Sequence, residues 1–244
     1  MREYSWLERP VSWTGLRAFE DLLARAALAR AWLAELGLDD EGETPDSSAA
    51  FGAAALARLT AKFGKGGLEP VFRDWCASEI GARTPEEALL ELARAVREAE
   101  TAAALRVKDA PRMHEISFEQ GRIAGRRAGN SGTLHAGGSL PPLRSILMAL
   151  HHSPLGWLDR PSQLPPLVER DVPGRIDWVL LECPHRDALV AEPAVQDFLC
   201  EQALAWFRGF CASIDPRLAL ERAPRDPARG CCRAVISWSG GAGR

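Results

Sequence analysis

The sequence lacks several features that mark common protein classes. It has no excess of positive charge, because 30 lysines and arginines stand against 33 aspartates and glutamates and give a formal net charge of −3. A nucleic-acid-binding protein needs basic residues to neutralise phosphates, so nucleic acid is a poor candidate partner. No apolar run approaches the roughly 18 residues that cross a bilayer, and charged residues interrupt the first ten positions. We therefore expect no signal peptide and no membrane partner, and a cytoplasmic location.

Cysteine is scarce as well. Six cysteines in 244 residues are too few and too scattered for a disulfide scaffold, and the chain has no Cys-x-x-Cys pair typical of structural zinc sites. We expect reduced thiols, no metal and no other cofactor. The positions of the cysteines are more informative than their number, since Cys183, Cys200, Cys231 and Cys232 all lie in the C-terminal third. The Ala-, Arg- and Leu-rich composition, with few lysines, is typical of a bacterial protein.

The first hundred residues are predicted to be helical. Apolar residues three or four apart from Leu16 to Leu33 indicate an amphipathic helix, which Gly37 ends. Two further helices are expected at about 48–63 and 68–80, separated by glycines. A threonine cap, a proline at the first helical position and a glutamate three residues after the cap start a fourth helix at 84–87, which is expected to run to about residue 100.

The remainder has a mixed pattern. Alternation at 105–107 and 113–118 predicts one or two short strands. Residues 121–139 contain six glycines and are predicted to be a loop, with a backbone anion nest at 125–132 as the alternative. In chain order, the remaining expected elements are a helix at 143–150 flanked by proline-rich extended chain, a strand at 176–181, a helix from Pro193 to Cys211, and strands at 218–220 and 234–238.

Together these elements predict an α+β fold, in which a helical N-terminal half packs on a small antiparallel sheet in the C-terminal half. We expect residues 1–100 to form the helical region and residues 101–244 the α+β region that carries the cysteines, with the two making one compact unit. The length and the 46% hydrophobic content are sufficient for a substantial core. Nothing in the sequence sets the oligomeric state.

The segment after the expected strand at 176–181 has the ingredients of a reactive site. Cysteine attacks as the thiolate, which a neighbouring imidazole or guanidinium stabilises, and His185 and Arg186 closely follow Cys183. Asp187 adds a carboxylate for proton transfer. The alternative is that Cys183 is a small buried residue that ends a strand beside a surface histidine.

Two cysteines share the expected helix that starts at Pro193. Cys200 and Cys211 are eleven residues apart, which returns them to nearly the same face as Leu204 and Phe207. We expect Cys211 to be a packing residue, whereas Cys200 lies nearer the helix start, where the dipole favours a thiolate. Cys231 and Cys232 are adjacent on a strand and face opposite sides, so only one of them can join a common site.

The layout of residues 177–238 is familiar. A strand leads to Cys183, a helix carries Cys200, and Arg222 precedes a glycine-containing turn to Cys232. This layout resembles the family named for L-2-amino-thiazoline-4-carboxylic acid hydrolase, whose named members open the 2-aminothiazoline ring to an N-carbamoyl cysteine. The resemblance implies that the family's three cysteines and its arginine correspond to Cys183, Cys200, Cys232 and Arg222. Ala203 stands where the family pattern has an aspartate. The layout is also similar, more loosely, to vinyl-reductase-type ligand-binding domains.

Two hypotheses follow. The first is a hydrolase for a small sulfur- or nitrogen-containing molecule, with Cys183 or Cys200 as the nucleophile and His185 or Asp187 in proton transfer. Its substrate would be bound by Arg222, whose planar fork suits a carboxylate, together with Cys232 and Trp178. The second is a non-catalytic ligand-binding or accessory domain, in which tryptophans line an apolar pocket and the cysteines pack or coordinate a metal. The hypotheses differ in whether the cysteines and Arg222 meet in one pocket.

Overall fold

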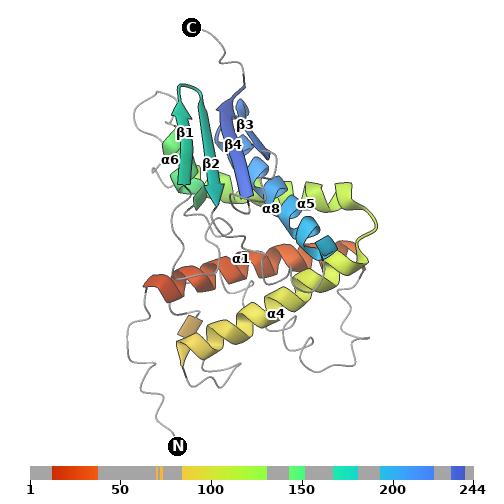
Figure 1. The fold of residues 1–244 in the computed structure, drawn as a ribbon. Helices are drawn as coiled ribbons and strands as arrows, with labels where there is room; N and C mark the ends of the chain where they lie inside the picture. Colours follow the sequence, from red (N-terminus) through yellow and green to blue (C-terminus); the bar gives the residue numbers. More distant parts are fainter. Residues whose placement is uncertain are drawn as a thin grey trace, which may run out of the picture. The chain divides into compact units, whose positions relative to one another are not determined.

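The computed structural model describes residues 13–37, 70, 72–73, 84–130, 143–151, 167–180, 193–222 and 232–239 (Figure 1). The chain divides into two compact units, with the main boundary after Val107. Helices α1 (Trp13–Glu35) and α4 (Pro85–Arg106) belong to the first unit. The second contains α5 (Ala110–Asn130), α6 (Leu143–His151), β1 (Leu167–Val172), β2 (Arg175–Leu180), α8 (Pro193–Ile214), β3 (Leu218–Arg222) and β4 (Cys232–Trp238). The predicted α+β class is confirmed.

In the first unit, α1 and α4 pack along each other through an apolar seam that encloses one ion pair. Phe19 and Trp32 on α1 and Val96 on α4 are buried in this seam. The guanidinium of Arg25 donates from Nε and Nη2 to the two carboxylate oxygens of Glu100, at 2.9 and 2.7 Å, and both side chains are buried. Two bonds to one buried carboxylate require a specific alignment, so the pair fixes the register of the two helices.

The predicted ends of these helices agree with the structure. Gly37, with a φ of 69°, follows α1 as its stop residue. At the start of α4, the Thr84 hydroxyl accepts from the Glu87 amide and the Glu87 carboxylate accepts from the Thr84 amide, each at 3.1 Å. Helix α4 continues beyond the expected residue 100, because the alanine-rich stretch that follows is a good helix former. The helices expected at 48–63 and 68–80 lie outside the described residues, apart from three helical positions between 70 and 73.

Residues 113–118 are helical, so the strand prediction there is wrong, as is the prediction of a loop over 121–130. Both segments belong to α5, which Asp109 caps by accepting from the Arg112 amide at 3.1 Å. Met113, Ser117 and Gly121 are buried at intervals of four residues, which is the period of a helix face. The alternation over six residues was too short to distinguish the two periods. The alternative prediction of a backbone anion nest is also wrong over 125–130, because the backbone there is helical.

Helices α5 and α8 approach each other so closely that their contact requires glycine. A methyl group at Gly121 of α5 would overlap the carbonyl oxygen of Trp206, and one at Gly209 of α8 would overlap that of Phe118. In this seam the Ser117 hydroxyl donates to Oε1 of Gln202 at 2.7 Å, with both side chains buried. Figure 1 shows the two helices side by side within the second unit. The backbone contact and the buried hydrogen bond together fix how α8 is placed.

The sheet is antiparallel, with strand order β1-β2-β4-β3. Strands β2, β3 and β4 correspond to predicted strands, whereas β1 falls in a segment that was expected to be extended chain between prolines. The missed signal is Pro173–Gly174, where the glycine has a φ of 79° and joins β1 to β2 in a tight hairpin. Within the described part of the chain, no helix is long and apolar enough to cross a membrane.

The two faces of the sheet differ in character. Ile176, Leu220 and Ile236 share one face and are buried, and α8 packs over this face along β3. The opposite face carries ion pairs, including Arg175 with Asp177 and Arg233 with Glu169. Helix α8 therefore lies between α5 and strand β3, while α6 contacts β2, β4 and α8.

The glycine seam can be tested with Gly121→Ala. Alanine favours a helix by about 1 kcal/mol over glycine, but here its methyl group meets the Trp206 carbonyl, and such overpacking costs about 1–3 kcal/mol or more. We expect a net loss of stability in urea denaturation followed by circular dichroism. Arg126→Ala, at an exposed position of the same helix, should change stability by less than about 0.5 kcal/mol. Equal stability of the two variants would refute the close contact.

Candidate functional site

A row of side chains crosses the apolar face of the sheet at the level of Arg222. Trp178 on β2 lies opposite Ala234 on β4, and Ala234 lies opposite Arg222 on β3. Residues directly opposite each other in antiparallel strands project to the same face, and two strand spacings amount to about 10 Å. The indole of Trp178 and the guanidinium of Arg222 therefore stand on one face with only the methyl group of Ala234 between them.

Helix α8 brings a carboxylate to this row. Nη1 of Arg222 donates to Oε1 of Glu201 at 2.7 Å, and Nε of Arg208 donates to the Leu220 carbonyl at 3.1 Å. These two bonds fasten α8 to β3. Cys200 directly precedes Glu201 and is half-buried, on the side of α8 that turns away from α5. Two site candidates predicted from the sequence, Cys200 and Arg222, are thus brought to one end of the sheet.

The remaining predicted site residues are placed only in part. Cys232 begins β4 opposite Leu180, two positions before Ala234, so the alternation of the strand assigns it to the face of the row. Its side chain is not among those described. Cys183, His185 and Asp187 lie outside the described residues, as does Cys231. Arg222, Trp178 and the strand position of Cys232 thus share one face of the sheet, and Cys200 is on the turn of α8 that the Glu201–Arg222 ion pair holds to β3.

The two cysteines of α8 have different environments. Cys211 is fully buried, and this burial raises the pKa of its thiol to about 12. It is a neutral packing residue, in agreement with the sequence-based expectation. Cys200 is only half-buried. The dipole argument for Cys200 is weaker than expected, however, because α8 begins at Pro193 and Cys200 lies beyond the first turn, where the dipole acts.

Trp178 carries a polar atom that the fold does not satisfy. The side chain is only 5% exposed, and its Nε1–H has no hydrogen-bond partner within the described structure. A buried donor without an acceptor is rare in folded proteins and calls for an explanation. The sequence analysis named Trp178 as a substrate-binding candidate, but gave no sign that its N–H would be buried without an acceptor.

Sequence reasoning missed Glu201 and Ala234. Glu201 follows a cysteine on a largely apolar helix, which was a usable signal, but its partner depends on how α8 sits on β3. Ala234 is important only because the strand register sets it between Trp178 and Arg222. This register cannot be predicted from a local sequence pattern.

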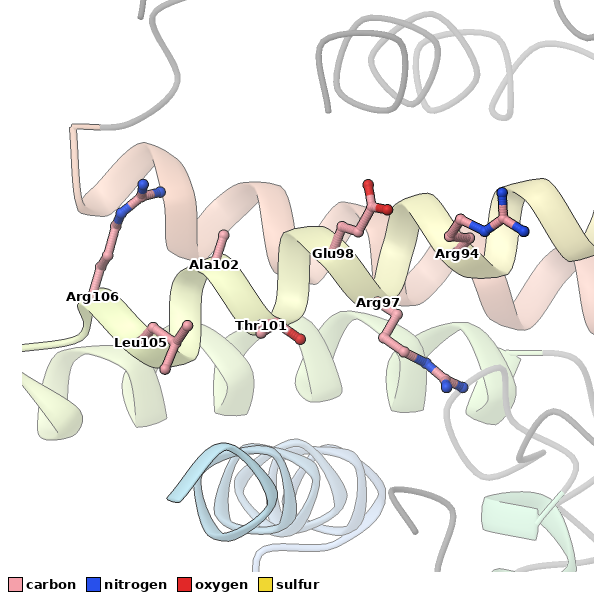
Figure 2. Close-up of a pocket in the computed structure, with 7 residues that line it drawn as sticks. All are labelled: Arg94, Arg97, Glu98, Thr101, Ala102, Leu105 and Arg106. Carbon is pink, nitrogen blue, oxygen red and sulfur yellow. The ribbon is translucent and has the colours of Figure 1, made fainter. Parts of the chain in front are cut away.

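A concave region of about 580 Å³ lies on α4 in the first unit. Arg94 and Arg97 each have an interaction partner in the structure. None of the predicted site residues is here. Figure 2 shows its seven lining residues, which are Arg94, Arg97, Glu98, Thr101, Ala102, Leu105 and Arg106. Nowhere among the described residues do three His, Cys, Asp or Glu side chains gather as metal ligands.

The chain was compared with known proteins at the level of families, sequences and structures. It shows no significant match to a family model, a curated protein or a solved structure. A function is therefore proposed from the residues of the row and from the turn of α8 that the Glu201–Arg222 ion pair holds to β3.

The difference between the two α8 cysteines is testable by alkylation. At pH 8 a thiol of pKa about 12 is ionised in roughly one molecule in ten thousand, against about a quarter for an unperturbed thiol. In the folded protein we expect iodoacetamide to modify Cys200 at least about tenfold faster than Cys211. Peptide mass spectrometry would measure both rates, with a guanidinium-unfolded control in which they converge. Modification of Cys211 as fast as Cys200 in the folded chain would contradict its burial.

Proposed function

We propose that the protein is a cysteine-dependent hydrolase of the thiazoline carboxylic acid hydrolase type, acting on a small sulfur- or nitrogen-containing substrate. The observation that carries the proposal is the ion pair between Arg222 and Glu201, because it holds the arginine beside the turn of α8 that contains Cys200. The family resemblance assigned these two residues to one site. Their approach in the fold supports that assignment.

The chemistry needs a nucleophile, a carboxylate holder and a proton carrier. A thiolate, from Cys200 or Cys183, adds to the ring carbon between nitrogen and sulfur, and the bond from that carbon to the ring sulfur breaks. The departing sulfur takes a proton, for which His185 or Asp187 is the candidate donor. Water then displaces the enzyme sulfur, which leaves the product with an N-carbamoyl group and restores the thiol.

Arg222 is suited to hold the carboxylate of the substrate. Its side chain is about one-third exposed, and Nη1 is the one nitrogen with a partner in the described structure. Nε and Nη2 form the second edge of the guanidinium fork, which can bind a carboxylate through two parallel hydrogen bonds. Glu201 balances the charge of Arg222 before the substrate arrives, and it orients the fork.

The same ion pair favours a second candidate function. Since Arg222 already has a carboxylate partner and its neighbours on the row, Ala234 and Trp178, carry apolar side-chain surface, a neutral apolar ligand would bind beside Arg222 without displacing any charge. In that case the protein is a ligand-binding or accessory domain and Cys200 is a packing residue. Turnover separates the two functions.

The proposal is tested by incubating the purified protein with L-2-amino-thiazoline-4-carboxylic acid and measuring N-carbamoyl cysteine by mass spectrometry. We expect turnover by the wild type and a loss of at least about a hundredfold in kcat for Cys200→Ser or Cys183→Ser, whichever is the nucleophile. Arg222→Lys should raise KM more than it lowers kcat, since lysine keeps the charge but loses the fork.

Cys211→Ala is the matched control, because it removes a thiol from the same helix face at a position where the thiol is un-ionised. It should keep kcat within about a factor of two while costing some stability. Thermal denaturation of each variant establishes that it is folded. Absence of turnover by the wild type, or full activity of both serine variants, would reject the cysteine-dependent hydrolase.

A further inference from the structure

Helix α4 carries an exposed stripe on the side that turns away from its seam with α1. The buried side chains of α4 include Leu92, Val96 and Glu100, and α1 is the described helix that packs along them. At about 100° per residue, the centre of the stripe lies roughly 150° around the helix axis from these buried positions. The stripe consists of Leu90, Arg94, Arg97, Glu98, Thr101 and Leu105, all exposed except the half-buried Thr101.

The two ends of the stripe are apolar. Leu90 is 63% exposed and Leu105 is 57% exposed, more than any other large apolar side chain in the described part of the protein. The two leucines are separated by about 22 Å along the helix and about 60° around it, so they share one side. The concave region on α4 follows the same stripe (Figure 2). Two such leucines flanking a charged centre favour contact with another protein surface.

The centre of the stripe carries opposite charges on adjacent residues. Arg97 and Glu98 are both exposed. The carboxylate of Glu98 has no partner among the residues that the structure describes. Arg97 has an interaction partner within the chain, but a guanidinium has five N–H donors and can bind a further carboxylate. The centre therefore offers a cation and an anion side by side.

The stripe is symmetric about the midpoint between Arg97 and Glu98. From either end, its members follow one another at steps of four, three, one, three and four residues. Two antiparallel copies of α4 related by a two-fold axis at this midpoint would match like with like at the apolar ends and opposite charges at the centre, as an isologous interface requires. The facing pairs would be Leu90 with Leu105, Arg97 with Glu98, and Arg94 with Thr101. Parallel copies would instead oppose Arg97 to Arg97 and Glu98 to Glu98.

We propose that the stripe on α4 is a homodimer contact, in which two copies of this chain pack antiparallel about a two-fold axis. The leucine pairs bury the exposed apolar ends. Two ion pairs between Arg97 of one copy and Glu98 of the other set the direction and register of the helices. Four turns of one helix make a small interface, so the dimer forms reversibly. This inference goes beyond the proposed hydrolase and does not depend on it.

Sedimentation velocity of the full chain, from low micromolar to submillimolar concentration, tests the contact. The wild type should pass reversibly from monomer to dimer. Glu98→Arg opposes two cations at the two-fold axis and should raise the Kd of the dimer at least about tenfold, as should Arg97→Glu. Combining the two substitutions exchanges the charges and should return the Kd to within about threefold of the wild type.

The direction of the helices is tested by crosslinking between copies. A chain with Leu90→Cys is mixed with a chain with Leu105→Cys, a short bismaleimide is added, and the linked peptides are identified by mass spectrometry. Facing helices lie about 8–10 Å apart, so position 90 of one copy should link to position 105 of the other. Two copies of position 90 should link much less, because they lie at opposite ends of the contact.

The matched control is Arg126→Glu, a charge reversal at an exposed position of α5 outside the stripe, which should leave the Kd unchanged. Thermal denaturation establishes that each variant is folded. A wild type that stays monomeric overturns the inference, since the stripe would then need a partner other than this chain. A Kd that ignores Glu98→Arg, a combined variant that does not recover, or equal linking of 90 to 90 also overturns it. Turnover enters none of these measurements, so failure of the hydrolase proposal leaves the dimer contact standing.

Discussion

The close contact between α5 and α8 is the constraint on which the second unit depends. Two helix backbones can meet at this distance only where side chains are absent, and Gly121 and Gly209 provide those positions. The buried bond from Ser117 to Gln202 then removes the freedom of one helix to slide along the other. Because one side of α8 packs against α5, other side chains of the helix are available to contact strand β3. The site follows from that arrangement.

Helix α8 presents different side chains towards α5 and away from it. Towards α5 it presents glycine, aromatic rings and a buried amide, and away from α5 it presents Cys200, Leu204 and Cys211. Glu201 and Arg208 reach the edge strand β3 and fasten the helix there. The row of Trp178, Ala234 and Arg222 lies on the apolar face of the sheet. The row carries two polar groups, the buried indole N–H of Trp178 and the guanidinium of Arg222, which is about one-third exposed.

Several helices and their ends could be predicted from the sequence, because the residues that determine them are close together in the chain. The capping box at Thr84, the stop at Gly37 and the apolar pattern of α8 each depend on neighbours within one or two turns. The misassignment of 113–118 arose because alternation over a short segment is compatible with two periods. Strand β1 was missed because prolines were weighted above the Pro173–Gly174 turn. In each case a longer window or the turn signal would have corrected the prediction.

The site itself was less predictable. The family resemblance selected Cys200, Cys232 and Arg222, and the fold brings these positions to one end of the sheet. What joins them is the register of β2, β4 and β3 and the rotation of α8 about its axis, which are set by the glycine contact and by long-range packing. The contribution of Ala234 and the unmet N–H of Trp178 become visible only once that register is known.

The central claim is that α8 places Cys200 over the face of the sheet that carries Arg222. It can be measured by crosslinking in a chain whose other five cysteines are replaced. Arg222→Cys and, as the control on the opposite face, Glu221→Cys each pair with Cys200, and a short bismaleimide is added to the folded protein. The account predicts an intramolecular crosslink between Cys200 and position 222 and much less with position 221. Equal crosslinking at both positions, or a preference for 221, would contradict it.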